Sequence, residues 1–546
     1  MNGILTHLVI LPVIVPLIVA ALLLLFRDQR RAVKAFVTFA TMLALLAISL
    51  TLLVMTANGA SDGWVGVYLL GNWSPVFGIV LVADRAAAVM ITLTSMLGAA
   101  TISFAAAKWN GAGPHFHSLF LFLITGVNGA FLTGDLFNLF VFFEIMLAAS
   151  YGLLLHGSSI AKVRSGLQYI AMNLIASSVF LIGVSLIYGV TGTLNMAELA
   201  LRVPMVQDAD RMLLEIGAAT LGTAFLLKAG MWPLSFWLVP AYTAAASPVA
   251  AVFAILSKVG IYIVWRLSLL IFGLDTGPSG GLAQNWLLIG GLVTLVFGSV
   301  GVLASQGLPR LTAYSVLVST GTMLVAIGIG GVPVAAGAFY YLVGSTLALS
   351  ALFMLVELIE RGRMAGADVL AVTMEAFGFE DEDVLPDEDE VGIPIPGTLA
   401  LLGVNFIICA LLIAGQPPLS GFIAKFAILS GIIGVQAGGA GTQIAGADWA
   451  AVALLIISGL AVLIAMLRSG INIFWATRED MTPRIGLVEI VPITVLIVSC
   501  VALTVFAGPA MTYFEATAAE LHNPVGYIQS VINTVPAPYP GRGGGL

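Results

Sequence analysis

Long apolar runs, separated by short polar segments, make up most of this 546-residue chain. A helix needs about 20 residues to cross the roughly 30 Å hydrocarbon core of a bilayer, and runs of that length predict fourteen membrane-spanning helices. The predicted spans cover residues 4–26, 33–56, 79–106, 115–133, 136–156, 167–190, 213–238, 243–270, 282–304, 311–330, 334–359, 397–434, 449–475 and 485–508. The pattern therefore predicts an all-α, polytopic membrane protein.

The composition narrows the function classes further. Only 9% of the residues are charged, whereas a soluble domain has about 25%, so a soluble globular protein is excluded. The net charge is −7 and no basic stripe is present, which argues against nucleic acid as a partner. The two cysteines, Cys409 and Cys500, lie in separate apolar runs and cannot form an iron–sulfur or zinc cluster. We expect no cofactor and no metal site.

The positive charges set the expected orientation. No Lys or Arg precedes the first run, and Arg27, Arg30, Arg31 and Lys34 follow it, which predicts a retained helix with its N-terminus outside. Alternating sides from there places thirteen Lys and Arg residues in the cytoplasmic connections and five outside. This asymmetry obeys the positive-inside rule and predicts that both termini lie outside.

Two segments outside the spans have unusual compositions. An acidic cytoplasmic loop, residues 365–395, carries a run of Asp and Glu over 375–390 without a compensating Lys or Arg. Such a run repels itself and favours an extended, solvated loop, with cation attraction or the docking of a subunit as alternatives. The tail from Pro509 onward is rich in Gly and Pro at its end, which predicts partial disorder.

A short motif occurs twice, with an offset of 185 residues. The segment 230–235 reads GMWPLS, and the segment 415–420 reads GQPPLS. Proline inside a spanning run removes a helical hydrogen bond, so Gly230, Pro233, Pro417 and Pro418 predict that helices seven and twelve are broken. Five helices fill the offset, and an odd number inverts the second copy, as in many transporters. A pair of packing kinks is the alternative interpretation.

This repeat predicts four parts of the chain. Residues 1–110 hold helices one to three, residues 111–275 hold the first five-helix repeat, residues 276–475 hold the second repeat with the acidic loop, and residues 476–546 hold helix fourteen and the tail. The serines that end the two motifs, Ser235 and Ser420, are candidate supporting groups beside the breaks.

Four ionisable residues lie well inside apolar runs: Glu144, Lys228, Lys258 and Lys425. Each such charge costs about 2.5–3.5 kcal/mol on insertion scales, so each should face a partner or water. One acid on span five and three bases on spans seven, eight and twelve suit a proton relay. Burial disfavours the charged form of each group, whereas pairing with an opposite charge favours it, so making or breaking a pair changes how readily each group holds a proton. Static ion pairs that fix helix packing are the alternative.

Other charges are less informative. Asp135 lies near the outer mouth of the Glu144 helix, where it is a helix N-cap or a supporting ligand. Asp84 and Arg85 are expected to pair with each other at the interface. The histidines at predicted cytoplasmic helix ends are expected to be solvated, and Glu357 begins an anchoring cluster. The histidines are His115, His117 and His156.

These residues resemble a family, the antiporter-like subunits of respiratory complex I, membrane-bound hydrogenases and Mrp-type Na+/H+ antiporters. The stretches PVFGIVLVADRAAAVM, LTGDLFNLFVFFEIMLAASYGLL and AGQPPLSGFIAKF are most similar to the D-type subunits of the Mrp branch. The resemblance implies that Glu144 and Lys228 form a regulating ion pair, that Lys258 is a central relay and that Lys425 is the terminal proton site. It also implies a bacterial inner membrane, a large complex I-like A-type subunit and small hydrophobic subunits as partners, and H+ and Na+ as transported ions.

The sequence departs from the family in two places. Lys425 stands where the complex I subunit of similar length usually has Glu, and a histidine common near the start of span eight in complex I relatives is absent from AAASPVAAVF. We therefore expect a proton-translocating subunit of a Na+/H+ antiporter, driven by the proton-motive force, and not an enzyme. The alternatives are a proton-pumping subunit of a redox-driven complex and a structural membrane subunit with vestigial charges.

Overall fold

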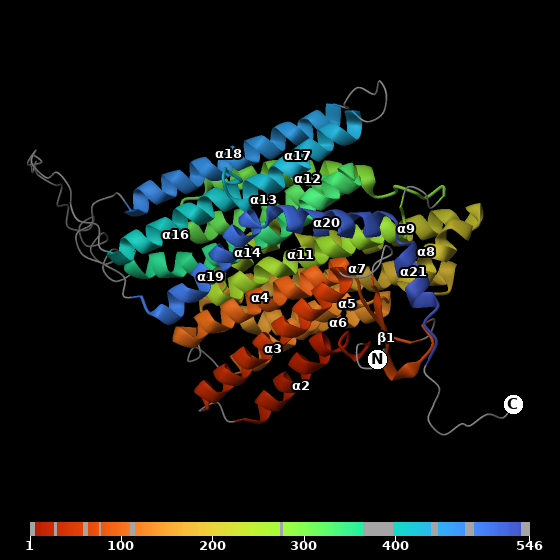
Figure 1. The fold of residues 1–546 in the computed structure, drawn as a ribbon, viewed down its shortest axis with the longest axis horizontal. Helices are drawn as coiled ribbons and strands as arrows, with labels where there is room; N and C mark the ends of the chain where they lie inside the picture. The colour runs from red at the N-terminus through yellow and green to blue at the C-terminus, as the bar shows by residue number, and fades with distance from the viewer. Residues whose placement is uncertain are drawn as a thin grey trace, which may run out of the picture.

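The fold is a bundle of long helices that run roughly parallel to one another across the molecule (Figure 1). The computed structural model describes residues 6–26, 30–57, 64–75, 78–109, 115–273, 277–363, 397–437, 446–474 and 485–536. The acidic segment 375–390 and residues 537–546 lie outside the described residues. The predicted all-α polytopic fold is confirmed.

The first half of the chain forms a small sheet, the helices up to the first broken span, and the helix that follows this span. The helices are α2 (Leu11–Leu25), α3 (Arg31–Ala57), α4 (Arg85–Lys108), α5 (Phe116–Leu132), α6 (Leu136–Leu154), α7 (Ile160–Thr191), α8 (Met196–Arg202), α9 (Asp208–Ala229), α10 (Leu238–Ala244) and α11 (Ser247–Leu270). Short 3₁₀ turns are η1 (Leu70–Asn72), η3 (Val203–Met205) and η4 (Leu234–Trp237).

The second half continues with the helices around the second broken span. They are α12 (Gln284–Ala304), α13 (Leu308–Ile329), α14 (Val332–Arg363), α16 (Gly397–Ala414), α17 (Ser420–Ala437), α18 (Gly446–Phe474), α19 (Leu487–Val505), α20 (Ala507–His522) and α21 (Val525–Ile532). In the described part of the chain, twelve helices are long and apolar enough to span a membrane, and α2, α5 and α17 are shorter apolar helices. With α16 and α17 counted as halves of one interrupted span, these helices match the fourteen predicted spans.

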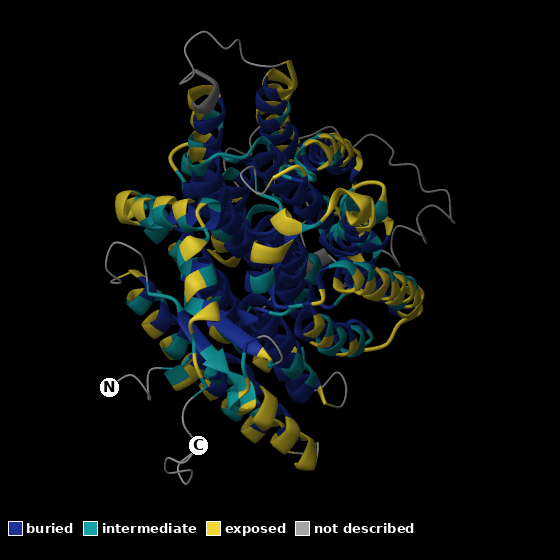
Figure 2. Cartoon of the chain, turned by 90° about the vertical axis from the view of Figure 1, so that its right-hand side faces the viewer, coloured by how far each residue is buried: buried dark blue, intermediate teal, exposed yellow. Residues whose placement is uncertain are grey.

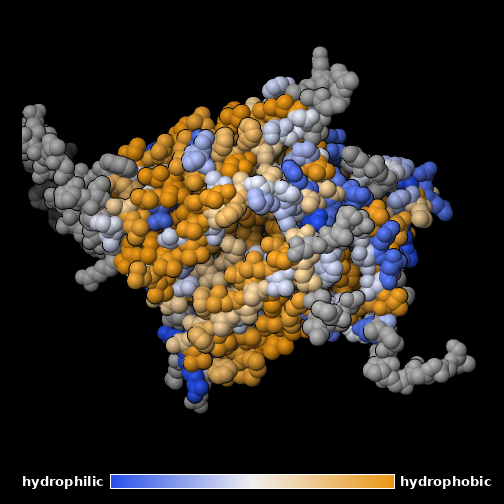
Figure 3. Space-filling view, viewed as in Figure 1, coloured by the Kyte–Doolittle hydropathy of each residue, from blue (hydrophilic) through white to orange (hydrophobic). Residues whose placement is uncertain are grey.

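Burial separates a central set of helices from an outer ring. Nearly every residue of α11, α13 and α14 is inaccessible, whereas α3, α7 and α19 keep apolar side chains exposed on one face. Figure 2 shows the buried residues gathered inside the bundle and the exposed ones on its rim. The visible surface is largely hydrophobic, and its hydrophilic residues lie mostly at the right-hand end, with a smaller group at the lower left (Figure 3). This distribution fits a bundle that faces lipid, because exposed apolar side chains are stable there.

A β-hairpin between α3 and α4 was not predicted. Strand β1 (Gly66–Leu69) pairs antiparallel with β2 (Val80–Ala83), with Gly66 opposite Ala83. Strand β2 leads directly into Asp84, whose carboxylate accepts a hydrogen bond from the Ala87 backbone N–H and caps α4. The hairpin therefore fixes where α4 begins, a short distance after the predicted start of span three.

The C-terminal region differs from the sequence prediction. The tail from Pro509, for which partial disorder was predicted, is helical up to residue 532, in α20 and α21, and its Gly/Pro-rich end from 537 lies outside the described residues. Pro509 lies in the first turn of α20, where a missing N–H costs no helical hydrogen bond. Helix α20 packs along α14 and reaches α11 and α4, so this segment belongs to the bundle.

Candidate functional site

The first broken span has a left-handed residue at its break. Helix α9 ends at Ala229, and Gly230 follows with φ +79°, a conformation that favours glycine. The Met231 backbone N–H returns to the Leu226 carbonyl at 3.0 Å, as in a Schellman cap. The chain then passes through a cis Trp232–Pro233 peptide bond into η4 and α10.

The second broken span has the same backbone arrangement. Helix α16 ends at Ala414, Gly415 has φ +74°, and the Gln416 N–H returns to the Leu411 carbonyl at 2.9 Å. A cis Pro417–Pro418 bond precedes α17, which begins at Ser420. In Figure 1, α9 lies toward the right-hand end of the molecule and α16 toward the left-hand end. The two breaks are thus approached from opposite ends, as an inverted repeat requires.

Each break exposes one helix-terminal carbonyl to a different donor. The Ala229 carbonyl accepts a hydrogen bond from Thr320 Oγ1 of α13 at 3.2 Å. The Ala414 carbonyl stands at the repeat-equivalent position and accepts one from Lys425 Nζ at 2.9 Å. At the first break, the freed carbonyl thus accepts a hydrogen bond from a hydroxyl, and at the second break from an ammonium. Only the ammonium carries a positive charge that leaves with the proton it releases.

Two glycines make room for the Lys425 side chain. A Cβ atom on Gly415 would lie 2.6 Å from Lys425 Cδ, and one on Gly459 of α18 would lie 2.9 Å from Lys425 Nζ. A Cβ on Gly459 would also lie 2.6 Å from the Ala414 oxygen. The Lys425 ammonium therefore occupies a slot between the break and α18 that side chains larger than glycine would fill.

Lys258 lies at the centre of the bundle and is fully inaccessible. Its Nζ donates to Ser319 Oγ of α13 at 2.6 Å, and Ser319 Oγ lies 3.1 Å from Ser345 Oγ of α14. Hydroxyl groups both donate and accept hydrogen bonds. The central lysine thus begins a short chain of hydroxyls that crosses three helices.

Ser420 lies between that hydroxyl chain and the second break. It is fully buried, and its Oγ has no hydrogen-bond partner among the described residues. The Oγ lies 3.6 Å from the Cβ position of Gly344, the neighbour of Ser345. Ser235, at the equivalent place in the first motif, is buried in η4.

Lys228 and Glu144 do not form a direct ion pair in this structure. Lys228 is 4% exposed, and its Nζ has no hydrogen-bond partner among the described residues and lies 4.8 Å from the centre of the Phe143 ring. The half-buried Glu144 carboxylate accepts a hydrogen bond from Ser177 of α7 instead. Glu144 is nevertheless the charge that acts on Lys228 electrostatically. Glu144 on α6 and Lys228 on α9 thus face each other without a direct ion pair.

Asp135 caps α6, the helix that carries Glu144. Its Oδ1 accepts a hydrogen bond from the Asn138 backbone N–H at 2.8 Å. Burial raises the pKa of the Asp135 carboxyl above its usual range, and the backbone hydrogen bonds oppose this shift. The residue anchors the start of the helix at the mouth of the bundle.

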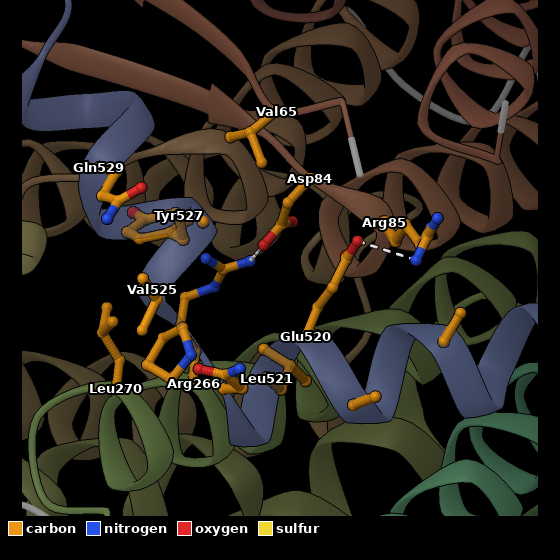
Figure 4. Close-up of a pocket in the computed structure, with 15 residues that line it drawn as sticks. Val65, Asp84, Arg85, Arg266, Leu270, Glu520, Leu521, Val525, Tyr527 and Gln529 are labelled. Carbon is orange, nitrogen blue, oxygen red and sulfur yellow. Dashed lines mark hydrogen bonds and ion pairs between the residues drawn. The ribbon is translucent and has the colours of Figure 1, made fainter. Parts of the chain in front are cut away.

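The predicted Asp84–Arg85 pair is wrong, because both residues pair with distant partners. Asp84 forms an ion pair with Arg266 of α11, and Arg85 forms one with Glu520 of α20 at 2.8 Å between Nη1 and Oε1 (Figure 4). Neighbours in the chain at a helix start point in different directions. Sequence reasoning gave neither Arg266 nor Glu520 a role or a partner.

The predicted solvation of His117 and His156 is also wrong. Both are buried, at 4% and 5% exposure, and Lys162 Nζ donates to the His156 carbonyl at 2.7 Å. Lys162 Nζ also lies over the Trp109 ring, whose Nε1 donates to Glu357 at 3.0 Å. Burial lowers the pKa of His156 below its usual range. The hydropathy of a helix end does not show whether another segment covers it, so the sequence could not predict the burial of these histidines. Glu357 pairs with Arg361, in keeping with the predicted cluster.

Among the described residues, no group of three or more His, Cys, Asp or Glu side chains could hold a metal ion. The polar residues at the centre are instead lysines, serines and threonines on α9, α11, α13, α14 and α17.

Comparisons with known proteins agree with this architecture. The family model described as NADH:quinone oxidoreductase/Mrp antiporter, transmembrane, matches residues 133–376. A protein of Rhizobium meliloti, named as a probable K(+)/H(+) antiporter subunit of type D, is 56% identical over 97% of this chain and 98% of its own length. The D-type Na(+)/H(+) antiporter subunit of Alkalihalophilus pseudofirmus is 34% identical over 96% of this chain and 99% of its own length.

Solved structures share the fold over nearly the whole chain. A chain of the Mrp complex from Dietzia sp. DQ12-45-1b aligns with a TM-score of 0.81 and 28% identity, over 97% of this chain and all of its own length. A chain of respiratory complex I from Thermus thermophilus aligns with a TM-score of 0.70 and 21% identity, over 96% of this chain and all of its own length. The second likeness shows the fold alone.

Proposed function

Because the chain belongs to the NADH:quinone oxidoreductase/Mrp antiporter family, among its D-type antiporter subunits, we propose that it is the proton-translocating subunit of a multi-subunit monovalent cation/proton antiporter driven by the proton-motive force. It is a multi-pass membrane protein with apolar outward faces. In this proposal it is a secondary transporter subunit that catalyses no chemical conversion.

One observation carries the proposal: three buried lysines lie at or between the two helix breaks. Lys228 precedes the first break, Lys258 donates to the hydroxyls at the centre, and Lys425 donates to the carbonyl freed by the second break. Each buried charge costs about 2.5–3.5 kcal/mol on insertion scales. Packing alone needs no such residue, whereas a lysine that takes up and releases a proton accounts for the cost.

The separation of Glu144 from Lys228 suggests how the first step is controlled. A carboxylate in contact with an ammonium favours the charged form, and its withdrawal favours release of the proton. In this structure Glu144 accepts a hydrogen bond from Ser177, and Lys228 Nζ has no hydrogen-bond partner among the described residues. In our proposal, Glu144 alternates between Ser177 and Lys228, and the released proton passes by way of Lys258 and the Ser319–Ser345 hydroxyls toward Lys425.

The transported cation is proposed to be Na+ or K+. The names of the relatives cited above divide between K+ and Na+, and the more similar of the two is named for K+. The membrane potential is worth about 2.3 kcal/mol per charge per 100 mV, so it drives exchange only when unequal charges move in each cycle. We propose H+ as the ion that this protein carries.

The proposed setting follows from the family and from the charge asymmetry. We propose the bacterial inner membrane, both termini outside, and a complex that contains a large complex I-like A-type subunit and small hydrophobic subunits. Among described residues, exposed apolar side chains on α18 and α19 are available to lipid or to those subunits.

The proposal is tested with the whole complex expressed in antiporter-deficient cells. Respiration acidifies everted vesicles, and addition of Na+ or K+ should release protons from the lumen, as followed with a pH-sensitive dye. Cells in which only this protein is missing from the complex serve as the control. Exchange with either cation supports the proposal. Absence of exchange with both cations, together with co-purified iron–sulfur subunits, contradicts it and favours the redox-driven alternative.

A further inference from the structure

A cavity of about 490 Å³ lies at the end of the bundle where α4 begins and α11 ends. Its charged lining comes from two ion pairs, Asp84–Arg266 and Arg85–Glu520, and α20 and α21 close one side of it (Figure 4). The orientation predicted from the positive-inside rule places the start of α4, and with it this end of the bundle, on the outer side of the membrane. The proton path proposed above, from Lys228 by way of Lys258 to Lys425, does not use any of these residues.

One face of α11 connects the cavity with the centre of the bundle. Lys258, Tyr262 and Arg266 are four residues apart in succession, so they lie on one stripe of the helix, about 6 Å apart along its axis. Arg266 Nε donates to the Tyr262 hydroxyl at 3.1 Å, and that hydroxyl donates to the Phe131 carbonyl at 3.1 Å. This polar stripe begins at the central lysine and ends in the cavity.

Exposure increases along the ion-pair cluster. The side chain of Arg266 is 5% exposed, that of Asp84 10%, that of Arg85 14% and that of Glu520 28%. Arg266 is held between the rings of Tyr262 and Tyr527, at 5.2 and 5.0 Å from their centres. Glu520 is therefore the charged group of the cluster that meets water, and Arg266 is the one that faces the interior.

The cavity also contains an unsatisfied polar group. The Tyr527 hydroxyl belongs to a residue that is 7% exposed, lines the cavity and has no hydrogen-bond partner among the described residues. A buried hydroxyl without a partner is costly, so it marks a place where a polar species fits. Its neighbour Arg266 is already paired with Asp84, which leaves the hydroxyl available to a proton-carrying species.

We propose that this cavity is the outer-face proton port of the Lys258 relay, and that Glu520 is the carboxyl that exchanges the proton with bulk water. The inference rests on the proposed proton translocation. In the direction driven by the proton-motive force, a hydronium ion at the outer face gives its proton to the Glu520 carboxylate, which forms an O–H bond and leaves water behind. The proton then leaves Glu520, passes along the Tyr262–Arg266 face and forms an N–H bond on the neutral Lys258 amine, and release follows the reverse order.

The charges around Glu520 suit a group that gains and loses a proton. Arg85 favours its carboxylate form and Asp84 its protonated form, and burial raises the pKa of Glu520 to about 7. The titratable and charged groups that face the cluster are, by element, Asp84 and Arg85 at the start of α4, Arg266 and Tyr262 on α11, Tyr513 on α20 and Tyr527 on α21.

The test uses the whole complex in right-side-out vesicles, with the inner pH fixed and the outer pH varied. Glu520→Gln should lower cation-dependent proton flux at least tenfold and remove its dependence on outer pH. Glu515→Gln, an exposed residue of the same helix, is the matched control and should behave as wild type. Should the Gln variant not assemble, Glu520→Asp should keep a dependence on outer pH that is displaced from the wild-type curve.

A second measurement tests access to the port. A Glu520→Cys variant should react with a membrane-impermeant maleimide added at the outer face, while Cys409 and Cys500 are fully buried and should not react. Wild-type flux and pH profile in Glu520→Gln, an unshifted profile in Glu520→Asp, or labelling only from the inner face overturns the port. If Lys425→Ala still abolishes exchange, the port alone is wrong; if Lys425→Ala also leaves exchange intact, the proposed function fails with it.

Discussion

The ammonium of Lys425 donates a 2.9 Å hydrogen bond to the Ala414 carbonyl, the last carbonyl before the second helix break. A helix leaves its final carbonyls without intrahelical partners, and burial makes such a group costly unless it is satisfied. The break thus creates an acceptor inside the bundle, and the lysine eleven residues later occupies it. The sequence motif predicts the helix break, and the break leaves a buried carbonyl that requires a hydrogen-bond donor. Lys425 is that donor.

This contact predicts a strong effect of a single methyl group at Gly459. In Gly459→Ala, the new Cβ would lie 2.6 Å from the Ala414 oxygen and 2.9 Å from Lys425 Nζ, so the two groups must separate. A hydrogen bond to a charged group contributes about 1.5–3 kcal/mol, and we expect exchange to fall about tenfold or more. The measurement is the initial rate of cation-dependent proton flux at equal amounts of assembled complex.

The control for that change is Gly434→Ala on α17, where a Cβ meets no atom within 4 Å. It should keep the wild-type rate. An unchanged rate in Gly459→Ala would show that the Lys425–Ala414 contact does not limit transport.

The hydroxyl beside Lys258 predicts a second effect on rate. Ser319→Ala removes the acceptor of the Lys258 ammonium and interrupts the link to Ser345. A positioned proton-transfer group contributes about 10²- to 10⁴-fold to a rate, so we expect exchange to decrease at least tenfold. Ser315→Ala, one turn earlier on α13 and bonded only to the Leu311 carbonyl, should have little effect. Equal rates in the two variants would contradict the role of Ser319.

The sequence predicted the axial positions of these groups but not their lateral neighbours. Hydropathy places Lys258 and Lys425 well inside their predicted spans, and the two Gly–Pro motifs place the breaks. Neither hydropathy nor the motifs show which helices lie side by side. The ion pair between Asp84 and Arg266, which are 182 positions apart in the chain, therefore could not be predicted. The burial of His117 and His156 is missed for the same reason, since a helix end looks solvated until a neighbouring segment covers it.

The C-terminal helices show a second limit of the sequence reasoning. The segment after Pro509 contains polar and charged residues, so it lacks the run of about 20 apolar residues that marks a span. It folds because α14 and α4 offer it a surface, with Phe514 stacked against Phe339 and the Tyr513 hydroxyl 2.9 Å from Thr56 Oγ1. Tertiary contact of this kind leaves little trace in composition.

The buried Asp84–Arg266 pair predicts a large loss of stability when one partner is removed. Arg266→Met leaves the Asp84 carboxylate buried without its counter-charge, and breaking such a pair costs about 3–5 kcal/mol. The thermal midpoint of the purified complex should fall clearly. Asp208→Ala removes a carboxylate that is 97% exposed in its pair with Arg211, and the effect should stay within about 1 kcal/mol. Equal midpoints would contradict the structural role of the buried pair.

Glu520 predicts a pH dependence of stability whose sign follows from its pKa. The folded-state pKa is raised from an ordinary 4.5 to about 7 by burial, so the folded protein holds this proton over a pH range where the unfolded chain has lost it. Stability from this group is therefore present at low pH and decreases as the pH rises from about 4.5 to 7. The thermal midpoint of Glu520→Gln should fall less over that range than that of wild type. A parallel fall in both proteins would contradict the raised pKa.

The central claim is that the buried charged residues carry the proton. The most direct measurement is cation-dependent proton flux in everted vesicles of the whole complex, at matched assembly, for Glu144→Gln, Lys228→Ala and Lys425→Ala, with the exposed Lys108→Ala as control. We predict that exchange is lost in the first three variants and retained in the control. Exchange at the wild-type rate in all four would show that these residues only pack the bundle and would contradict the account.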